Sequence, residues 1–202
     1  TAVMLSSVSD RFAVEGWLDD RRLTAFVLGP GFGDRERAVE YARAVSEHAR
    51  ALVLDADGLS AFAEYLEELA GLGEKTKLAL TPHEGEFKKL FGALAADDSL
   101  SKIERAQMAA NQINGVVVYK GADTVIAAPD GRAAVNVDGP PWLATAGSGD
   151  VLAGLIGANL AQGMPAFEAA CAGVARHSAA GIMAGPGMTA EELLANVGLS
   201  QV

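Results

Sequence analysis

The residues that point most directly to chemistry form the segment Gly147-Ser148-Gly149-Asp150, which stands before a run of helix-forming residues. Glycines at the start of a helix let backbone N–H groups point outward, and the helix dipole favours an anion there. A carboxylate in the first helical turn can accept a hydroxyl proton and orient the oxygen toward phosphorus. The segment predicts a phosphate site beside Asp150. The alternative is that Asp150 only stabilises the helix start.

Two better-known phosphate-binding patterns do not match this segment. A Walker A loop continues with Gly-Lys-Ser or Gly-Lys-Thr, and no such sequence follows Gly149. The dinucleotide-binding fingerprint follows the first strand of its domain, whereas Gly147 comes late in the chain. The segment therefore predicts a helix-start phosphate site of another kind.

A lysine and a histidine offer further ligand contacts. Lys120 ends a strand-like run and opens the loop Lys120-Gly121-Ala122-Asp123-Thr124, whose ammonium, hydroxyl and N–H groups can contact a phosphate. An exposed lysine at a strand end is an equally good interpretation. His83 follows the rigid pair Thr81-Pro82 and can hydrogen-bond a substrate. Taken alone, a loop histidine favours a surface role without ligand.

The remaining candidate residues predict no direct metal ligand. Asp55 and Asp57 can help to hold Mg²⁺ through water, but aspartate is common in turns and we favour that interpretation. His177 and Cys171 lie in an Ala/Gly-rich helical pattern and are expected to be packing residues. The histidines are far apart and lack metal-ligand spacing.

Alternating strand and helix patterns must position these residues. Strand–helix–strand order at this spacing predicts parallel strands with right-handed crossovers and helices on both faces. Ligands bind at the carboxyl ends of such strands, and the loops described above follow strands. The expected strands are 25–28, 51–54, 77–80 and 116–119, with a hairpin of 124–128 and 133–137, and the expected helices are 34–50, 59–72, 84–91 and 101–114, followed by two or three small-residue helices.

Composition narrows the class of protein. The chain has 202 residues, of which 50% are hydrophobic and 21% charged, so one globular domain over residues 1–202 is expected. A net charge of −10 argues against binding to nucleic acid or to an anionic membrane. The single cysteine excludes an intramolecular disulfide and fits the cytoplasm. No apolar run is long enough for a membrane span, and no signal peptide is visible.

Read together, the motifs resemble those of the NAD(P)H-hydrate dehydratase family, within the ribokinase-like superfamily. The pair Thr-Pro-His-x-Gly-Glu and Ala-Thr-x-Gly-x-Gly-Asp-Val-Leu is fairly specific, whereas Gly-x-Gly-Asp alone indicates only the superfamily. The resemblance runs in family order from Phe26 to Gly181. Its stretches are Val27–Gly33, Leu54–Leu59, Leu80–Phe87, Val118–Ile126 and Leu143–Gly154.

The resemblance implies an α/β fold of three α/β/α layers, with a mostly parallel central sheet and a β-hairpin. It also implies repair of hydrated NADH or NADPH with ADP or ATP as co-substrate, through phosphorylation of the ring hydroxyl and loss of phosphate. Mg²⁺ would offset the phosphate charge, and family members often form tetramers. The implied roles are catalysis by Asp150, nucleotide binding by Lys120, Gly121, Ala122, Asp123, Thr124, Gly147, Ser148 and Gly149, and hydrate binding by Gly31, His83 and Asp150.

Two departures and two rival functions accompany this interpretation. The N-terminal strand–helix region of the family is not found ahead of Thr1, so the chain is expected to be the later part of the family domain. Gly139-Pro140-Pro141-Trp142 replaces a Gly-Asn-Pro-Gly type of turn, which places Trp142 near the catalytic loop. The rivals are a small-molecule kinase of the same superfamily, for hydroxymethylpyrimidine or a sugar, and a nucleotide-binding module without turnover.

Overall fold

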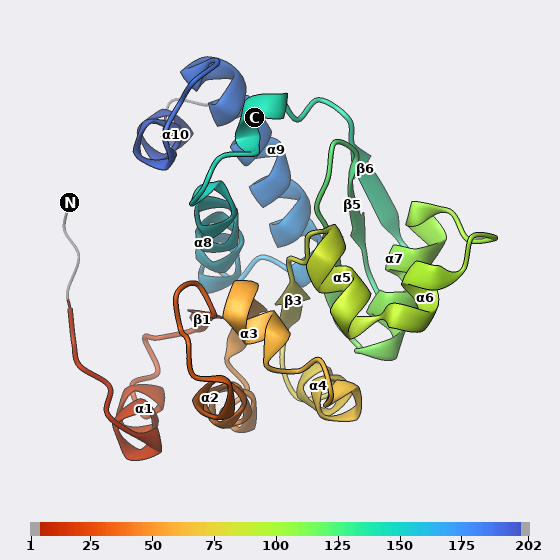
Figure 1. Cartoon of the computed structure of the whole chain (residues 1–202). Helices are drawn as coiled ribbons and strands as arrows, with labels where there is room; N and C mark the ends of the chain where they lie inside the picture. Colours follow the sequence, from red (N-terminus) through yellow and green to blue (C-terminus); the bar gives the residue numbers. More distant parts are fainter. Residues whose placement is uncertain (1–4, 199–202) are drawn as a thin grey trace.

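A single six-stranded sheet organises the molecule (Figure 1). The computed structural model describes residues 5–198. The strands lie side by side in chain order: β1 to β4 are parallel, β5 is antiparallel to β4, and β6 is antiparallel to β5. The predicted mostly parallel sheet and its hairpin are therefore confirmed. Their bounds are β1 (Ala25–Leu28), β2 (Ala51–Leu54), β3 (Leu78–Leu80), β4 (Val116–Tyr119), β5 (Thr124–Ala127) and β6 (Ala133–Asn136).

Helices cover both faces of the sheet, as the strand–helix alternation predicts. Helices α1 to α7 pack on one face and α8 and α9 on the other, while α10 lies against α9. Their bounds are α1 (Arg11–Leu18), α2 (Arg35–Glu47), α3 (Ala56–Ser60), α4 (Leu66–Gly73), α5 (Glu84–Leu90), α6 (Gly92–Ala96), α7 (Lys102–Gln112), α8 (Ser148–Ala161), α9 (Ala166–Ala184) and α10 (Ala190–Val197), with a 3₁₀ turn at Pro141–Leu143.

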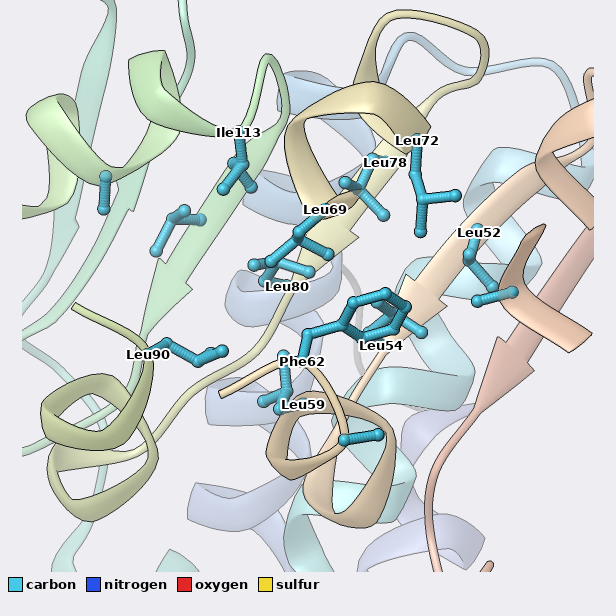
Figure 2. Packing of buried hydrophobic residues seen from close by; sticks show 14 of the residues in the cluster. Leu52, Leu54, Leu59, Phe62, Leu69, Leu72, Leu78, Leu80, Leu90 and Ile113 are labelled. Atoms are coloured by element: carbon cyan, nitrogen blue, oxygen red, sulfur yellow. The ribbon is translucent and has the colours of Figure 1, made fainter. Parts of the chain in front are cut away.

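Strand side chains alternate between two apolar cores. In β2, Leu52 and Leu54 join the core beneath α1 to α7, whereas Ala51 and Val53 join the core beneath α8 and α9. Figure 2 shows the first core, where leucines from β2, β3 and α4 surround Phe62. Burial of each such leucine side chain contributes roughly 1.5–3 kcal/mol to the free energy of folding, relative to leaving it exposed. Burial on both faces explains why β2, β3 and β4 are continuous apolar runs.

The helix expected over 59–72 forms as two pieces, α3 and α4. Gly58 packs so tightly that a Cβ there would lie 2.4 Å from the Leu28 carbonyl oxygen, which fixes α3 against the end of β1. The chain then turns, and Tyr65 has a non-helical backbone (φ −129°, ψ 43°). The apolar spacing could not show this break, because both pieces bury leucines in the same core.

Small residues bring the C-terminal helices close to their neighbours. A Cβ at Gly157 of α8 would lie 2.6 Å from Val27 Cγ2, and one at Gly173 of α9 would lie 2.7 Å from Ile156 Cγ1. Two of the expected small-residue helices are therefore present as α8 and α9, and glycines let them pack closely. In the part of the chain that the structure describes, no helix combines the length and the apolar character needed to cross a membrane.

Candidate active site

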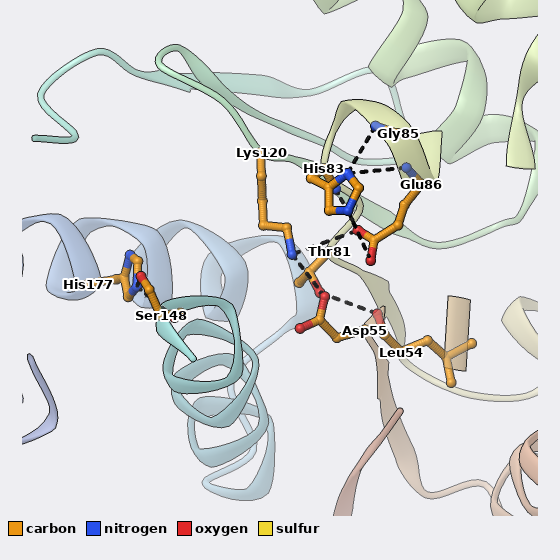
Figure 3. A network of polar contacts seen from close by, with 9 residues as sticks. All are labelled: Leu54, Asp55, Thr81, His83, Gly85, Glu86, Lys120, Ser148 and His177. Carbon is orange, nitrogen blue, oxygen red and sulfur yellow. Dashed lines mark hydrogen bonds and ion pairs between the residues drawn. The ribbon is translucent and has the colours of Figure 1, made fainter. Parts of the chain in front are cut away.

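The ends of three parallel strands bring Asp55, Thr81 and Lys120 together (Figure 3). Each residue directly follows its strand, and parallel strands end at one edge of the sheet. Lys120 Nζ lies 2.9 Å from Asp55 Oδ1, and Thr81 Oγ1 donates to the same oxygen at 2.8 Å. The Lys120 backbone N–H also donates to the Pro82 carbonyl at 2.8 Å, which fixes where the lysine leaves the sheet.

Asp55 and Lys120 form a buried ion pair, which corrects the preferred interpretation of Asp55 as a turn residue. Asp55 is 2% exposed, so its negative charge needs a partner. Lys120 supplies it, and the same ammonium lies 3.9 Å from Glu86 Oε2. Because β2 and β4 are distant in sequence, no local pattern could indicate this pairing.

The predicted phosphate turn lies directly beside this ion pair. Gly147 has φ +81°, a conformation that favours glycine, and α8 begins at the next residue. A Cβ at Gly149 would lie 3.4 Å from Lys120 Nζ and 3.6 Å from Asp55 Oδ2. Within residues 5–198, no acceptor is recorded for the N–H groups of Gly149 and Asp150. The structure thus joins free amides, a lysine and the exposed Asp150 in one region.

Ser148 points away from this surface. Its side chain is 2% exposed, and its hydroxyl lies 3.0 Å from His177 Nε2. Its N–H donates to the Thr145 carbonyl at 3.3 Å. The predicted nucleotide contact of Ser148 therefore receives no support from its side chain, and the open donors belong to the two residues that follow.

The loop after Lys120 is held by its own polar contacts. Thr124 Oγ1 donates to the Gly121 carbonyl at 3.1 Å and accepts from the Gly121 N–H at 3.3 Å. Asp123 accepts from Lys102 Nζ at 2.7 Å, and this hydrogen bond lowers the pKa of Asp123. Lys102 was not singled out in the sequence, although it stands in the first turn of a helix whose N-cap, Ser101, is readily recognised.

His83 has a structural role in addition to its predicted ligand role. Its Nδ1 accepts from the N–H of Gly85 at 2.9 Å and of Glu86 at 3.3 Å, so His83 caps α5. Glu86 completes a reciprocal pair by accepting from the His83 N–H at 2.8 Å. With Nδ1 used as an acceptor, the ring proton resides on Nε2. The side chain is 61% exposed, and the ring therefore remains accessible to a ligand.

The loop after β1 lies at the same edge of the sheet and contacts the segment that follows β2. Gly31 and Gly33 have φ +64° and +74°, and the Gly33 N–H donates to Asp57 Oδ2 at 2.9 Å. Asp57 thus ties the loop of Gly31 to the segment that follows β2. This carboxylate acts as a turn residue, in agreement with the preferred interpretation.

Two cavities in the structure lie away from these residues. A cavity of about 240 Å³ lies between α2 and α4, and one of about 180 Å³ lies near the start of β3 and β4. The first is lined by exposed ion-pairing residues such as Arg43 and Glu68. Neither contains a predicted site residue, so the candidate site is identified by its chemistry rather than by its depth.

Comparison with known proteins agrees with this arrangement. The sequence profile described as NAD(P)H-hydrate dehydratase, of carbohydrate-kinase type, matches residues 2–196. The bifunctional NAD(P)H-hydrate repair enzyme Nnr of Gloeobacter violaceus is 47% identical over 164 residues, which cover 81% of this chain and 31% of that protein. The ADP-dependent (S)-NAD(P)H-hydrate dehydratase of Neisseria meningitidis is 41% identical, with 78% and 54% covered.

A solved structure supports the same relationship. The ADP/ATP-dependent NAD(P)H-hydrate dehydratase of Bacillus subtilis, co-crystallised with ATP and Mg²⁺, superposes with a TM-score of 0.76 at 26% identity, covering 93% of this chain and 68% of that one. The three-layer fold inferred from the motifs is therefore shown. With a family profile spanning nearly all of its length and motifs that converge at one edge of the sheet, this chain belongs to the NAD(P)H-hydrate dehydratase family.

Proposed function

We propose that the chain performs the nucleotide-dependent dehydration of hydrated NADH or NADPH. The observation that carries the proposal is the approach of Lys120 to Gly149, the residue directly before Asp150 in the first turn of α8. Free amides at a helix start bind phosphate, and a lysine beside them adds positive charge. The names of the relatives from Gloeobacter and Neisseria support the same reaction.

We assign phosphate binding and proton transfer to different residues. The α8 amides of Gly149 and Asp150 and the ammonium of Lys120 hold the polyphosphate, together with the loop from Gly121 to Thr124. Asp150 accepts the proton of the ring hydroxyl while the hydroxyl oxygen forms a bond to the terminal phosphorus of the nucleotide. The bond from that phosphorus to the bridging oxygen of the nucleotide breaks at the same time. The ring carbon–oxygen bond then breaks, phosphate departs with the electron pair, and a proton leaves the neighbouring carbon.

Phosphorylation explains why a nucleotide is consumed to remove water. Phosphate leaves far more readily than hydroxide, so transfer of one phosphoryl group makes the elimination easy. On the substrate side, His83 offers a ring that is 61% exposed, with Nε2 3.6 Å from Glu86 Oε1, and Gly31 offers backbone free of a side chain. We assign both to the hydrated nicotinamide.

The site also suits a magnesium ion that accompanies the nucleotide. Within residues 5–198, no three acidic, histidine or cysteine residues are grouped as metal ligands. Mg²⁺ with a nucleotide needs only one or two carboxylates, because phosphates and water supply the other ligands. Asp55 Oδ2 faces Gly149 and fits that requirement through water. When bound, the ion offsets phosphate charge, as the structure of the Bacillus relative with ATP and Mg²⁺ suggests.

One assay tests the proposal against its rivals. The chain is incubated with hydrated NADH or hydrated NADPH, Mg²⁺, and ADP or ATP. Return of the absorbance of the reduced nicotinamide together with phosphate release supports the dehydratase. A stable phosphorylated vitamin precursor or sugar, formed in parallel incubations, would establish the kinase instead. Stabilisation by nucleotide without turnover of any substrate would establish a binding module.

We also propose that copies of the chain associate through the C-terminal helices and that the protein works in the cytoplasm. Ile182, Met183 and Leu194 are each at least half exposed on α9 and α10, which supports association. The single, partly buried Cys171 supports a reducing compartment. Light scattering of the purified chain gives the mass of the assembly, and a monomer would contradict the first proposal.

A further inference from the structure

A buried histidine that the proposed reaction does not use lies directly behind the phosphate turn. His177, on α9, is 7% exposed. Its Nε2 lies 2.9 Å from the Ser148 carbonyl oxygen and 3.0 Å from the Ser148 hydroxyl (Figure 3). Both contacts are made to the first residue of α8, which immediately precedes the open amides of Gly149 and Asp150.

The contact to the carbonyl fixes the state of the ring. A carbonyl oxygen only accepts hydrogen bonds, so Nε2 carries the proton and donates it to Ser148. Burial lowers the pKa of His177, the hydrogen bond to the Ser148 carbonyl raises it by a smaller amount, and the charge of Lys120 lowers it further, so that the net shift is downward. The ring is therefore neutral at neutral pH. It supplies no charge to the phosphate site, and its effect on that site is positional.

Helix α8 begins without a side-chain cap, as do α3, α4, α6 and α9. Other helices, including α1, α2, α5, α7 and α10, begin with a side chain that accepts from their first N–H groups. A cap of that kind on α8 would occupy the amides that a phosphate requires. His177 holds the turn from its inner side and leaves the outward amides free.

We propose that His177 is a positioning residue, which holds the first turn of α8 in the conformation that binds the polyphosphate. This role rests on the proposed function of the turn as the nucleotide site. His177 acts through Ser148 and touches neither nucleotide nor substrate.

The test compares two substitutions of His177 with a control on the same helix. Glutamine can place its amide N–H near the position of Nε2, whereas leucine fills the space without a donor. Ser178→Ala is the matched control, since Ser178 is also buried and accepts from Asn136 Nδ2 at 2.9 Å, a contact to β6 rather than to α8. ADP affinity is measured by calorimetry with Mg²⁺ present, alongside the melting temperature of each variant.

We expect His177→Leu to weaken ADP binding roughly tenfold, because small displacements of a binding group are costly. His177→Gln should recover most of the affinity, and Ser178→Ala should bind ADP like the wild type even where its melting temperature falls. If His177→Leu does not fold, His177→Asn takes its place, since asparagine is too short to reach Ser148.

The outcomes separate this role from the proposed function. Equal weakening of ADP binding in His177→Leu and Ser178→Ala, or unchanged affinity in His177→Leu, overturns the role of His177 alone. Lack of recovery in His177→Gln also counts against it. If the wild-type chain binds neither ADP nor ATP, the proposed nucleotide site and the positioning role fall together.

Discussion

The two ends of the parallel strands differ in the burial of their ion pairs. At the carboxyl ends, Lys120 and Asp55 form a buried ion pair beside Gly149 in the first turn of α8. At the amino ends, the 180 Å³ cavity is bordered by Arg132, whose ion pairs with Asp130 at 2.8 Å and Glu168 at 2.6 Å are about half exposed. Exposed pairs contribute little to stability. The carboxyl ends are therefore identified as the candidate active site by a buried ion pair and hydrogen-bond donors, and not by the size of a cavity.

The largest effect on activity is expected at Asp150. Asp150→Asn removes the proton acceptor but leaves the amides of the turn in place. The kcat should fall by about 10²–10⁴-fold while nucleotide affinity is retained. Steady-state kinetics and calorimetry measure the two quantities. Near-normal turnover would show that Asp150 is only a helix-start residue.

The largest effect on stability is expected at the ion pair. Lys120→Met leaves the Asp55 carboxylate buried without its cation, which should cost about 2 kcal/mol or more. The loss stays below the roughly 3–5 kcal/mol of a fully enclosed pair, because the Lys120 side chain is 20% exposed.

A double-mutant cycle sharpens this comparison. Adding Asp55→Asn to Lys120→Met should restore part of the free energy of unfolding, because the buried charge is then absent. Denaturant titration of the four proteins gives the coupling. Strictly additive losses would mean that the two residues do not depend on each other.

Substitution of His83 should have a smaller effect, partly on stability and partly on ligand binding. His83→Ala removes both the cap of α5 and the ring, with a loss of about 1 kcal/mol in stability. His83→Asn keeps a good capping residue and removes only the ring. Both variants should weaken binding of the hydrated nicotinamide more than binding of ADP. Equal losses for the two ligands would remove His83 from the substrate side.

A pH dependence of stability follows from the lowered pKa of His177. The unfolded chain takes up this proton near the ordinary pKa of 6.5, whereas the folded chain takes it up only at lower pH. The stabilisation is therefore complete above about pH 6.5 and is lost as the pH falls toward the folded value. Thermal unfolding between pH 7 and 5 should show this slope, and His177→Gln should flatten it. An identical slope in the variant would assign it to other groups.

The smallest effect is expected at the opposite end of the sheet. Arg132→Ala removes exposed ion pairs and a cation–π contact to Phe167, so turnover and ADP affinity should not change. The melting temperature should change little. A marked loss of turnover would show that the amino ends take part in function and would break the comparison.

Local sequence patterns predicted most of the fold because strands and helices leave periodic signals. All six strands were placed to within a residue or two, and the caps Asp34 and Ser101 marked the starts of α2 and α7. Helix α1 was missed, although Asp10 caps it, because its eight residues carry only two fully buried apolar side chains.

The sequence predicted individual residues of the site better than the contacts between them. Glycines and a lysine at strand and helix ends indicated phosphate binding from local sequence alone. The pairing of Lys120 with Asp55 and of His177 with Ser148 joins residues far apart in the chain. Only the fold brings such groups within hydrogen-bonding distance. The sequence alone therefore predicts a packing role for His177 and a turn role for Asp55.

The loops after β1 and β2 touch backbone to backbone. At Gly29 (φ +133°) a methyl group would sit 1.8 Å from the Asp55 carbonyl oxygen, and at Gly58 it would sit 2.4 Å from the Leu28 carbonyl oxygen. The two loops are consequently joined through their backbones, and Asp55 belongs to this junction. A side chain at Gly29 or Gly58 would displace the segment that carries Asp55, the partner of Lys120, whereas a Cβ at Gly31 would meet no atom within 4 Å and is disfavoured only by the positive φ.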